Sequence, residues 1–71
     1  LRNIKMEFKD KRIVITGASG LVGYPTVIKC LEEGAREVIA ADIKISDELQ
    51  QLKTKFPIGQ LSLRQVDLTY L

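Results

Sequence analysis

Apolar residues along the chain fall into short β-like runs separated by stretches with helical spacing. The segments RIVIT (12–16) and EVIAADI (37–43) are rich in β-branched and small apolar residues, and the first is typical of a strand buried on both faces. In QLSLRQVDL (60–68) two leucines alternate with polar residues, and Val66 follows after a one-residue slip. The pattern therefore predicts three strands.

Two helices are predicted between these strands. Over 21–33, four apolar side chains follow the i, i+3, i+4, i+7 spacing of one helix face: Tyr24, Val27, Ile28 and Leu31. Gly34 then stands where a glycine commonly follows a helix. The second helix is predicted over 46–56, with Ser46 as N-cap and acidic residues in its first turn. Its apolar stripe consists of Leu49, Leu52 and Phe56.

The resulting order, β-α-β-α-β, determines the expected fold class. Parallel strands joined by helices need right-handed crossovers, so we expect an α/β protein with a Rossmann-type βαβαβ half of a doubly wound parallel sheet. A full sheet of this kind has more strands and helices on both faces. Residues 1–71 are accordingly expected to be the N-terminal part of a larger nucleotide-binding domain.

Composition excludes several classes of function. The 71 residues are 45% hydrophobic and 28% charged, with a net charge of +2, as in ordinary globular domains. The loose basic group around the predicted turn at 9–11 lacks interleaved aromatic residues, so we expect a solvated turn and no nucleic-acid binding. No apolar run reaches the ~18 residues of a membrane span.

The scarcity of cysteine and histidine limits the chemistry further. A lone cysteine, Cys30, cannot form an internal disulfide, which favours a reducing, cytoplasmic setting. It lies at the edge of the predicted helix and is interpreted as a partly buried packing residue rather than a nucleophile. Because histidine is absent from the sequence, no histidine-based metal site or Ser-His catalysis is expected, and we assign no metal ligands.

The segment VITGASGLVGYP (14–25) carries three of the five glycines, at Gly17, Gly20 and Gly23. Gly17 would allow a tight turn, Gly20 would let the backbone approach a pyrophosphate, and Gly23 would let the helix pack closely on the strand. Helix N-termini bind phosphate through unpaired N–H groups and the helix dipole. The rest of the predicted cofactor-binding turn is Ala18, Ser19, Leu21 and Val22. The alternative is a packing turn without a ligand.

The second candidate is Asp42, which ends the second predicted strand 19 residues after Gly23. This is the distance at which an acidic residue accepts hydrogen bonds from the ribose hydroxyls of NAD. Its charge would repel the extra phosphate of NADP, so NAD is the expected cofactor, with Ile43 beside it. NADP remains the alternative, because Lys44, or Arg36 folding across, would compensate that phosphate. Asp42 could also simply stabilise a turn.

The third candidate pair follows the last predicted strand. The Asp67 carboxylate could accept a hydrogen bond from the adenine amino group, with the backbone of Leu68 alongside. The alternative is that Asp67 caps a helix beginning near Thr69. The two roles are compatible.

Three motifs, TGASGLVG (16–23), AADI (40–43) and VDLT (66–69), resemble in order and spacing the N-terminal part of the short-chain dehydrogenase/reductase superfamily. The resemblance covers residues 11 to 69. The glycine spacing T-G-x-x-G-x-x-G is similar to the extended branch, which contains NAD-dependent epimerases and dehydratases. The other branch of this superfamily, the shorter oxidoreductases, typically shows T-G-x-x-x-G-x-G, which would need glycine at the position of Leu21.

The resemblance implies the cofactor half of an NAD-dependent enzyme, an oxidoreductase or an isomerase, that acts on the carbonyl/hydroxyl couple of a small molecule. A nucleotide sugar is one candidate substrate, and a homodimer is the expected full-length state. The family's catalytic Tyr-x-x-x-Lys pair is not matched: Tyr24 precedes Ile28 by four residues, and Tyr70 has no partner. No catalytic residue is assigned here. The alternative is a non-catalytic dinucleotide sensor.

Overall fold

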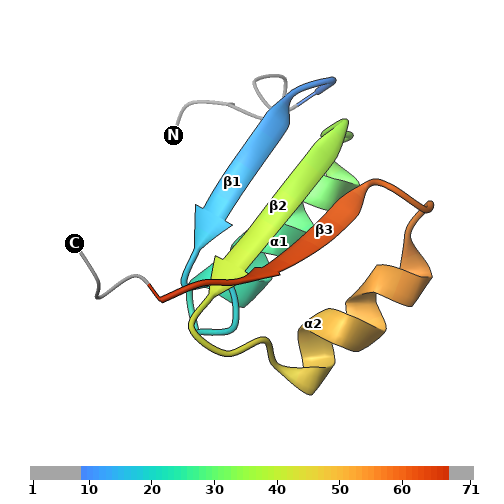
Figure 1. Cartoon of the computed structure of the whole chain (residues 1–71). Helices are drawn as coiled ribbons and strands as arrows, with labels where there is room; N and C mark the ends of the chain where they lie inside the picture. Colours follow the sequence, from blue (N-terminus) through green and yellow to red (C-terminus); the bar gives the residue numbers. More distant parts are fainter. Residues whose placement is uncertain (1–8, 68–71) are drawn as a thin grey trace.

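The computed structural model describes residues 9–67 as a three-stranded sheet with two α-helices (Figure 1). The elements follow in the order β1 (Arg12–Thr16), α1 (Gly23–Glu32), β2 (Glu37–Asp42), α2 (Asp47–Leu52), the 3₁₀ turn η2 (Lys53–Lys55) and β3 (Leu61–Gln65). All neighbouring strands are parallel, and their spatial order is β1-β2-β3. This confirms the predicted α/β class and the Rossmann-like half.

The strand register places one set of apolar side chains on the face that carries the helices. Because side chains alternate along a strand, every second residue of each strand belongs to this set. It forms two rows across the sheet: Ile13–Val38–Leu61 and Ile15–Ala40–Leu63.

Both helices pack on this same face and share one core with the strands. From α1, Val27, Cys30 and Leu31 are buried, and from α2, Leu49 and Leu52 are buried. Figure 1 shows α1 behind the sheet. Two right-handed crossovers that run in the same direction along a sheet place their helices on the same side. The predicted helix faces are therefore confirmed as core-facing, with Tyr24, Ile28 and Phe56 partly buried against the cluster.

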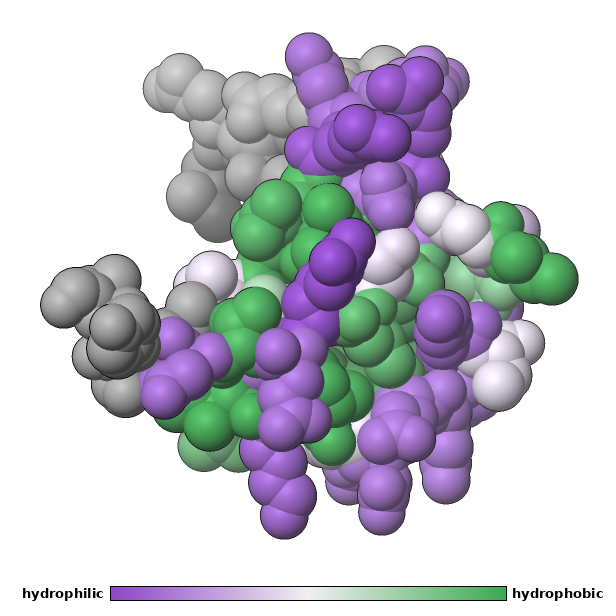
Figure 2. All heavy atoms as spheres, in the orientation of Figure 1, coloured by the Kyte–Doolittle hydropathy of each residue, from purple (hydrophilic) through white to green (hydrophobic). Residues whose placement is uncertain are grey.

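The opposite face of the sheet is open in the described part of the chain, so the expectation that the first strand is buried on both faces is wrong here. The Val14 side chain is 62% exposed, and Thr16 is exposed beside it. On this face Glu37 accepts from Arg12 Nε at 3.2 Å and from Ser62 Oγ at 2.8 Å. Figure 2, in the orientation of Figure 1, shows apolar atoms between polar ones over this face.

Helix α1 ends in a Schellman motif, as the position of Gly34 predicts. The Gly34 amide donates to Leu31 O at 3.2 Å, and the Ala35 amide donates to Cys30 O at 3.1 Å. The side chain of Gln60 adds two further bonds from the start of β3, since its Nε2 donates to Ala35 O at 2.9 Å and to Leu31 O at 3.3 Å. The end of α1 is thus hydrogen-bonded, through Leu31, to a residue 29 positions later.

Helix α2 begins as predicted but is shorter. Ser46 is its N-cap and accepts from the Leu49 amide at 3.2 Å. The α-helix stops at Leu52, the next three residues form the 3₁₀ turn, and Phe56 is extended. Pro57 explains this end, because a proline disfavours helical backbone at the residue before it.

Two further differences from the sequence-based expectations concern β3 and Cys30. The strand ends at Gln65, so the apparent slip at Val66 reflects a residue beyond the strand. Cys30 is 1% exposed, deep in the core rather than at its edge, and burial raises the pKa of its thiol. Within residues 9–67 no helix is both long and apolar enough to cross a membrane.

Candidate functional site at the carboxyl edge of the sheet

The loops that follow the three parallel strands meet at one edge of the sheet. The glycine loop (17–22) follows β1, the β2–α2 loop (43–46) follows β2, and residues 66–67 follow β3. In open parallel sheets, ligands bind outside the carboxyl ends of the strands. All the predicted site residues within the described ranges lie at this edge, and Leu68 lies outside the described residues.

The glycine loop turns sharply and is attached to the neighbouring strand. Gly17 has a φ of +65°, which glycine adopts without steric cost. The Gly20 amide donates to Gly17 O at 3.0 Å, and the Ala18 amide donates to Ala41 O of β2 at 3.1 Å. Ala18 is fully buried, so it anchors the loop while its neighbours face outward.

Gly23 marks the closest approach of α1 to this loop. A Cβ at this position would overlap the Gly17 carbonyl oxygen and lie 2.7 Å from the Gly17 carbonyl carbon and 2.9 Å from Ala18 Cα. A Cβ at Gly20 would lie 3.3 Å from the Gly17 oxygen, a tight but less severe contact. The packing role predicted for Gly23 is therefore present in the structure, and it needs no ligand.

The N-terminus of α1 carries free backbone donors. Val22 occupies the N-cap position without a side-chain cap bond, and the first turn contains no acidic residue. The amides of Leu21, Val22 and Gly23 donate to no other group among residues 9–67. The Leu21 and Val22 side chains are 97% and 79% exposed. Unpaired N–H groups and the positive end of a ten-residue helix therefore lie at this edge.

Asp42 joins the end of β2 to the glycine loop. Its Oδ2 accepts from the Ser19 amide at 2.8 Å, and its Oδ1 accepts from the Ile43 amide at 2.6 Å. Each carboxylate oxygen can accept more than one hydrogen bond, so the half-buried group keeps acceptor capacity toward a ligand. Asp42 thus stabilises the turn, which is one of the two roles predicted for it. This role does not prevent the carboxylate from also accepting hydrogen bonds from ribose hydroxyls.

Ser19 connects the glycine loop to the β2–α2 loop through its side chain. Its Oγ donates to Lys44 O at 2.8 Å and accepts from the Ser46 amide at 3.0 Å. Sequence spacing carries no signal for these contacts, because they join residues 25 and 27 positions apart through the shape of two loops. Beside them lies an open groove of about 590 Å³, lined by Ser19, Gly20, Asp42, Lys44, Ile45, Ser46 and Asp47.

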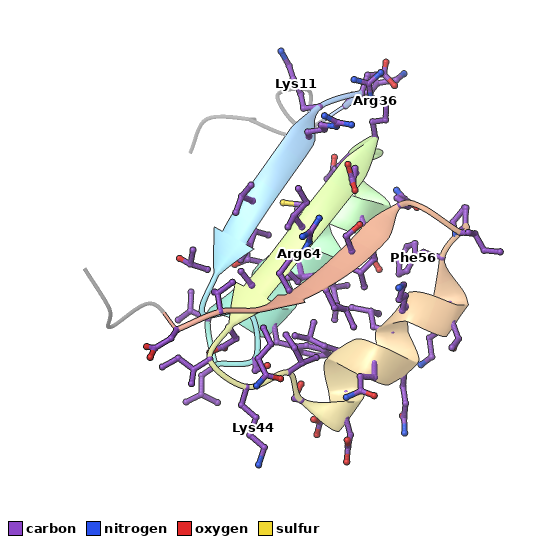
Figure 3. All side chains as sticks on the ribbon, in the orientation of Figure 1. Lys11, Arg36, Lys44, Phe56 and Arg64 are labelled. Carbon is purple, nitrogen blue, oxygen red and sulfur yellow. The ribbon has the colours of Figure 1, made fainter. Side chains whose placement is uncertain are left out.

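The two cations considered for a 2′-phosphate lie in different places. Lys44 lines the groove beside Asp42, takes part in no ion pair among residues 9–67, and extends away from the sheet in Figure 3. Arg36 precedes β2 and lies with Lys11 at the opposite end of the sheet (Figure 3). Six strand residues span about 20 Å, so Arg36 cannot fold across to this edge.

A second groove of about 490 Å³ brings Ile43 and Asp67 together, with Gln65 and Val66. The Val66 amide donates to Asp42 O at 2.8 Å and carries the pairing of β2 and β3 past the end of β3. Ile43 is 53% exposed and supplies apolar surface next to the Asp67 carboxylate. Two of the predicted cofactor-binding residues, Ile43 and Asp67, therefore line the same groove. Thr69, where the alternative prediction for Asp67 places the start of a helix, lies outside the described residues.

Comparison with known proteins places the chain near an oxidoreductase. No protein-family model matches it. The chain is 38% identical over 61 residues to an uncharacterized oxidoreductase of Staphylococcus saprophyticus, a match that covers 86% of this chain and 24% of that relative. The chain thus spans about a quarter of the length of the curated relative it matches. The similarity indicates a relationship to an oxidoreductase family.

Proposed function

We propose that the carboxyl edge of this sheet binds NAD and that the chain is the cofactor-binding segment of an NAD-dependent oxidoreductase. The observation that carries the proposal is the set of free amides at Leu21, Val22 and Gly23, on a helix end without a capping carboxylate. Such an end favours phosphate. The similarity to an oxidoreductase supports the same class of protein.

The residues at this edge fit the parts of a dinucleotide. The glycine loop and the start of α1 would hold the pyrophosphate through backbone N–H groups. Asp42 would accept from the adenosine ribose hydroxyls, and Ile43 with Asp67 would contact the adenine. We propose that the finer family is the extended short-chain dehydrogenase/reductase branch, on the motifs TGASGLVG and VDLT.

The proposed role of this chain is binding and orientation. NAD, when bound, supplies hydride transfer. The free amides at Leu21, Val22 and Gly23 and the carboxylate of Asp42 would hold the cofactor against the sheet edge. Its substrate would be a small molecule with a carbonyl/hydroxyl couple, a nucleotide sugar being one candidate. Residues 9–67 would select NAD over NADP, because the Asp42 charge opposes a 2′-phosphate.

The test is NADH binding by the full-length protein, measured by fluorescence titration. Gly20→Val should weaken binding at least ~10-fold, about 1.4 kcal/mol, because a branched side chain would stand in the loop. Gly20→Ala should have a smaller effect. Thr54→Val, which adds valine at an exposed position beyond α2, serves as control. Unchanged affinity in a Gly20→Val protein that melts like the wild type would contradict the site.

A further inference from the structure

We propose that Ser19 is a positioning residue for cofactor selectivity: its hydroxyl fixes the β2–α2 loop so that the Lys44 side chain extends away from the Asp42 carboxylate. This inference rests on the proposed function, because it concerns the same NAD site. In this role the Ser19 hydroxyl contacts the β2–α2 loop of the protein and does not donate a hydrogen bond to the cofactor phosphates.

The hydrogen bonds of the Ser19 side chain support this role. A serine hydroxyl has one proton to donate, and in Ser19 that proton is directed to Lys44 O at 2.8 Å. The same oxygen accepts from the Ser46 amide at 3.0 Å. The hydroxyl therefore has no second proton to offer a phosphate, and both its partners belong to the β2–α2 loop.

The backbone of Ser19 performs a separate task. Its amide donates to Asp42 Oδ2 at 2.8 Å, and Asp42 Oδ1 accepts from the Ile43 amide. These two bonds orient the carboxylate and do not depend on the serine side chain. Replacing the hydroxyl alone would leave Asp42 in place and release residues 44–46.

Releasing this loop would change the charge around the groove. Lys44 lines the groove beside Asp42, its side chain extends away from the sheet (Figure 3), and it has no ion-pair partner among residues 9–67. With its main-chain carbonyl no longer held, the Lys44 ammonium could approach the groove and offset the charge of a 2′-phosphate. NADP would then be rejected less strongly, while the Asp42 contacts remained.

The experiment compares NADH and NADPH affinities of the full-length protein by fluorescence titration, for the wild type, Ser19→Ala and Ser19→Thr. Ser19→Ala removes both hydrogen bonds of the hydroxyl to the β2–α2 loop and should lower the NADH-to-NADPH preference about fivefold. Ser19→Thr keeps a hydroxyl and should show the NADH-to-NADPH preference of the wild type. Thr26→Ala is the matched control, since the Thr26 hydroxyl also donates to a backbone carbonyl, Val22 O at 2.8 Å, without touching the β2–α2 loop.

The outcomes separate this inference from the function on which it rests. A general loss of stability would weaken both cofactors alike, so only a change in their ratio that Ser19→Thr reverses supports a positioning role. If the wild type binds NADH and Ser19→Ala keeps the wild-type ratio, the role of Ser19 is contradicted and the site stands. If the wild type binds neither cofactor, the proposed function itself fails, and this inference with it.

Discussion

Gly23 lies against the carbonyl group of Gly17, too close for any side chain at position 23. Replacing it with alanine must therefore displace either the glycine loop or the start of α1. Over-packing of this kind costs about 1–3 kcal/mol, and the obstacle here is backbone. We expect Gly23→Ala to lower the free energy of unfolding by at least about 2 kcal/mol, measured by urea denaturation of the full-length protein.

Gly20→Ala is the matched comparison, because it adds the same methyl group to the same loop at 3.3 Å from the Gly17 oxygen. A shift of a few tenths of an ångström would accommodate it, so its cost should be clearly smaller. Equal effects of the two substitutions would show that the close approach at Gly23 does not limit stability.

Asp42→Asn should change the choice of cofactor. The amide keeps one acceptor oxygen for the Ser19 or Ile43 amide but loses the negative charge that opposes a 2′-phosphate. NADH should bind about 10-fold more weakly, about 1.4 kcal/mol, and NADPH should lose less. Competitive titration with both cofactors measures the ratio.

Two controls locate the effect of Asp42→Asn. Asp47→Asn makes the same charge change at an exposed position lining the same groove, and Arg36→Ala removes a cation from the opposite end of the sheet. Both should leave the ratio close to that of the wild type. A comparable change in the Asp47→Asn protein would mean that overall charge, rather than contact with Asp42, determines selectivity.

Ser46→Ala removes the N-cap of α2 while keeping the Ser46 amide that donates to Ser19. The loss of a serine N-cap costs about 1 kcal/mol, and a six-residue helix has few other local contacts to compensate. Chemical denaturation should show this decrease in the free energy of unfolding. Thr54→Ala, which removes a hydroxyl bonded to Gln51 O at 2.7 Å on the exposed end of α2, should cost less.

Cys30 should make stability depend on alkaline pH. Burial raises the pKa of its thiol in the folded protein, so the unfolded chain loses this proton first as the pH rises. The contribution of the neutral thiol is fully present below the ordinary thiol pKa of about 8.5 and decreases as the pH rises above it toward the higher folded pKa. The stability difference between wild type and Cys30→Ala should therefore shrink above about pH 8.5.

This difference can be followed in urea titrations between pH 7 and 10. Lysine and tyrosine titration affects both proteins and cancels in the comparison. A difference that stays constant over this range would indicate that the Cys30 thiol ionises alike in the folded and unfolded states. Thiol alkylation should be slow in the native protein for the same reason.

The fold could be predicted because its signals are local. The β-branched run of β1, the helical spacing around Val27 and the cap at Ser46 each lie within a few residues and agree with one another. The early end of α2 was also encoded locally, in Pro57, although the apolar stripe to Phe56 suggested a longer helix. The full burial of Cys30 was not predicted, because a residue next to the apolar stripe of a helix can lie at the edge of the core or inside it, and the sequence alone does not distinguish the two.

The site could be predicted only in part. The glycine spacing and the position of Asp42 at the end of a strand predicted which edge of the sheet carries the candidate site. The contacts of Asp42 and Ser19 depend on how two loops approach each other in space, over separations of 23 to 27 residues. Hydrophobic periodicity in the sequence carries no information about such contacts. The open sheet face likewise follows from the placement of both helices rather than from the composition of β1.

The two bonds from the Gln60 side chain have a consequence for how the protein folds. The Gln60 side chain can donate to Leu31 O, in the last turn of α1, and to Ala35 O, just beyond the helix, only when the start of β3 lies against this end of the helix. A βαβ unit made of β1, α1 and β2 alone would lack both Gln60 bonds, and Leu31 O would keep only its bond from the Gly34 amide. We therefore expect the end of the first helix and the start of the third strand to open together in native-state hydrogen exchange, although the whole of β2 and α2 separates them in the sequence.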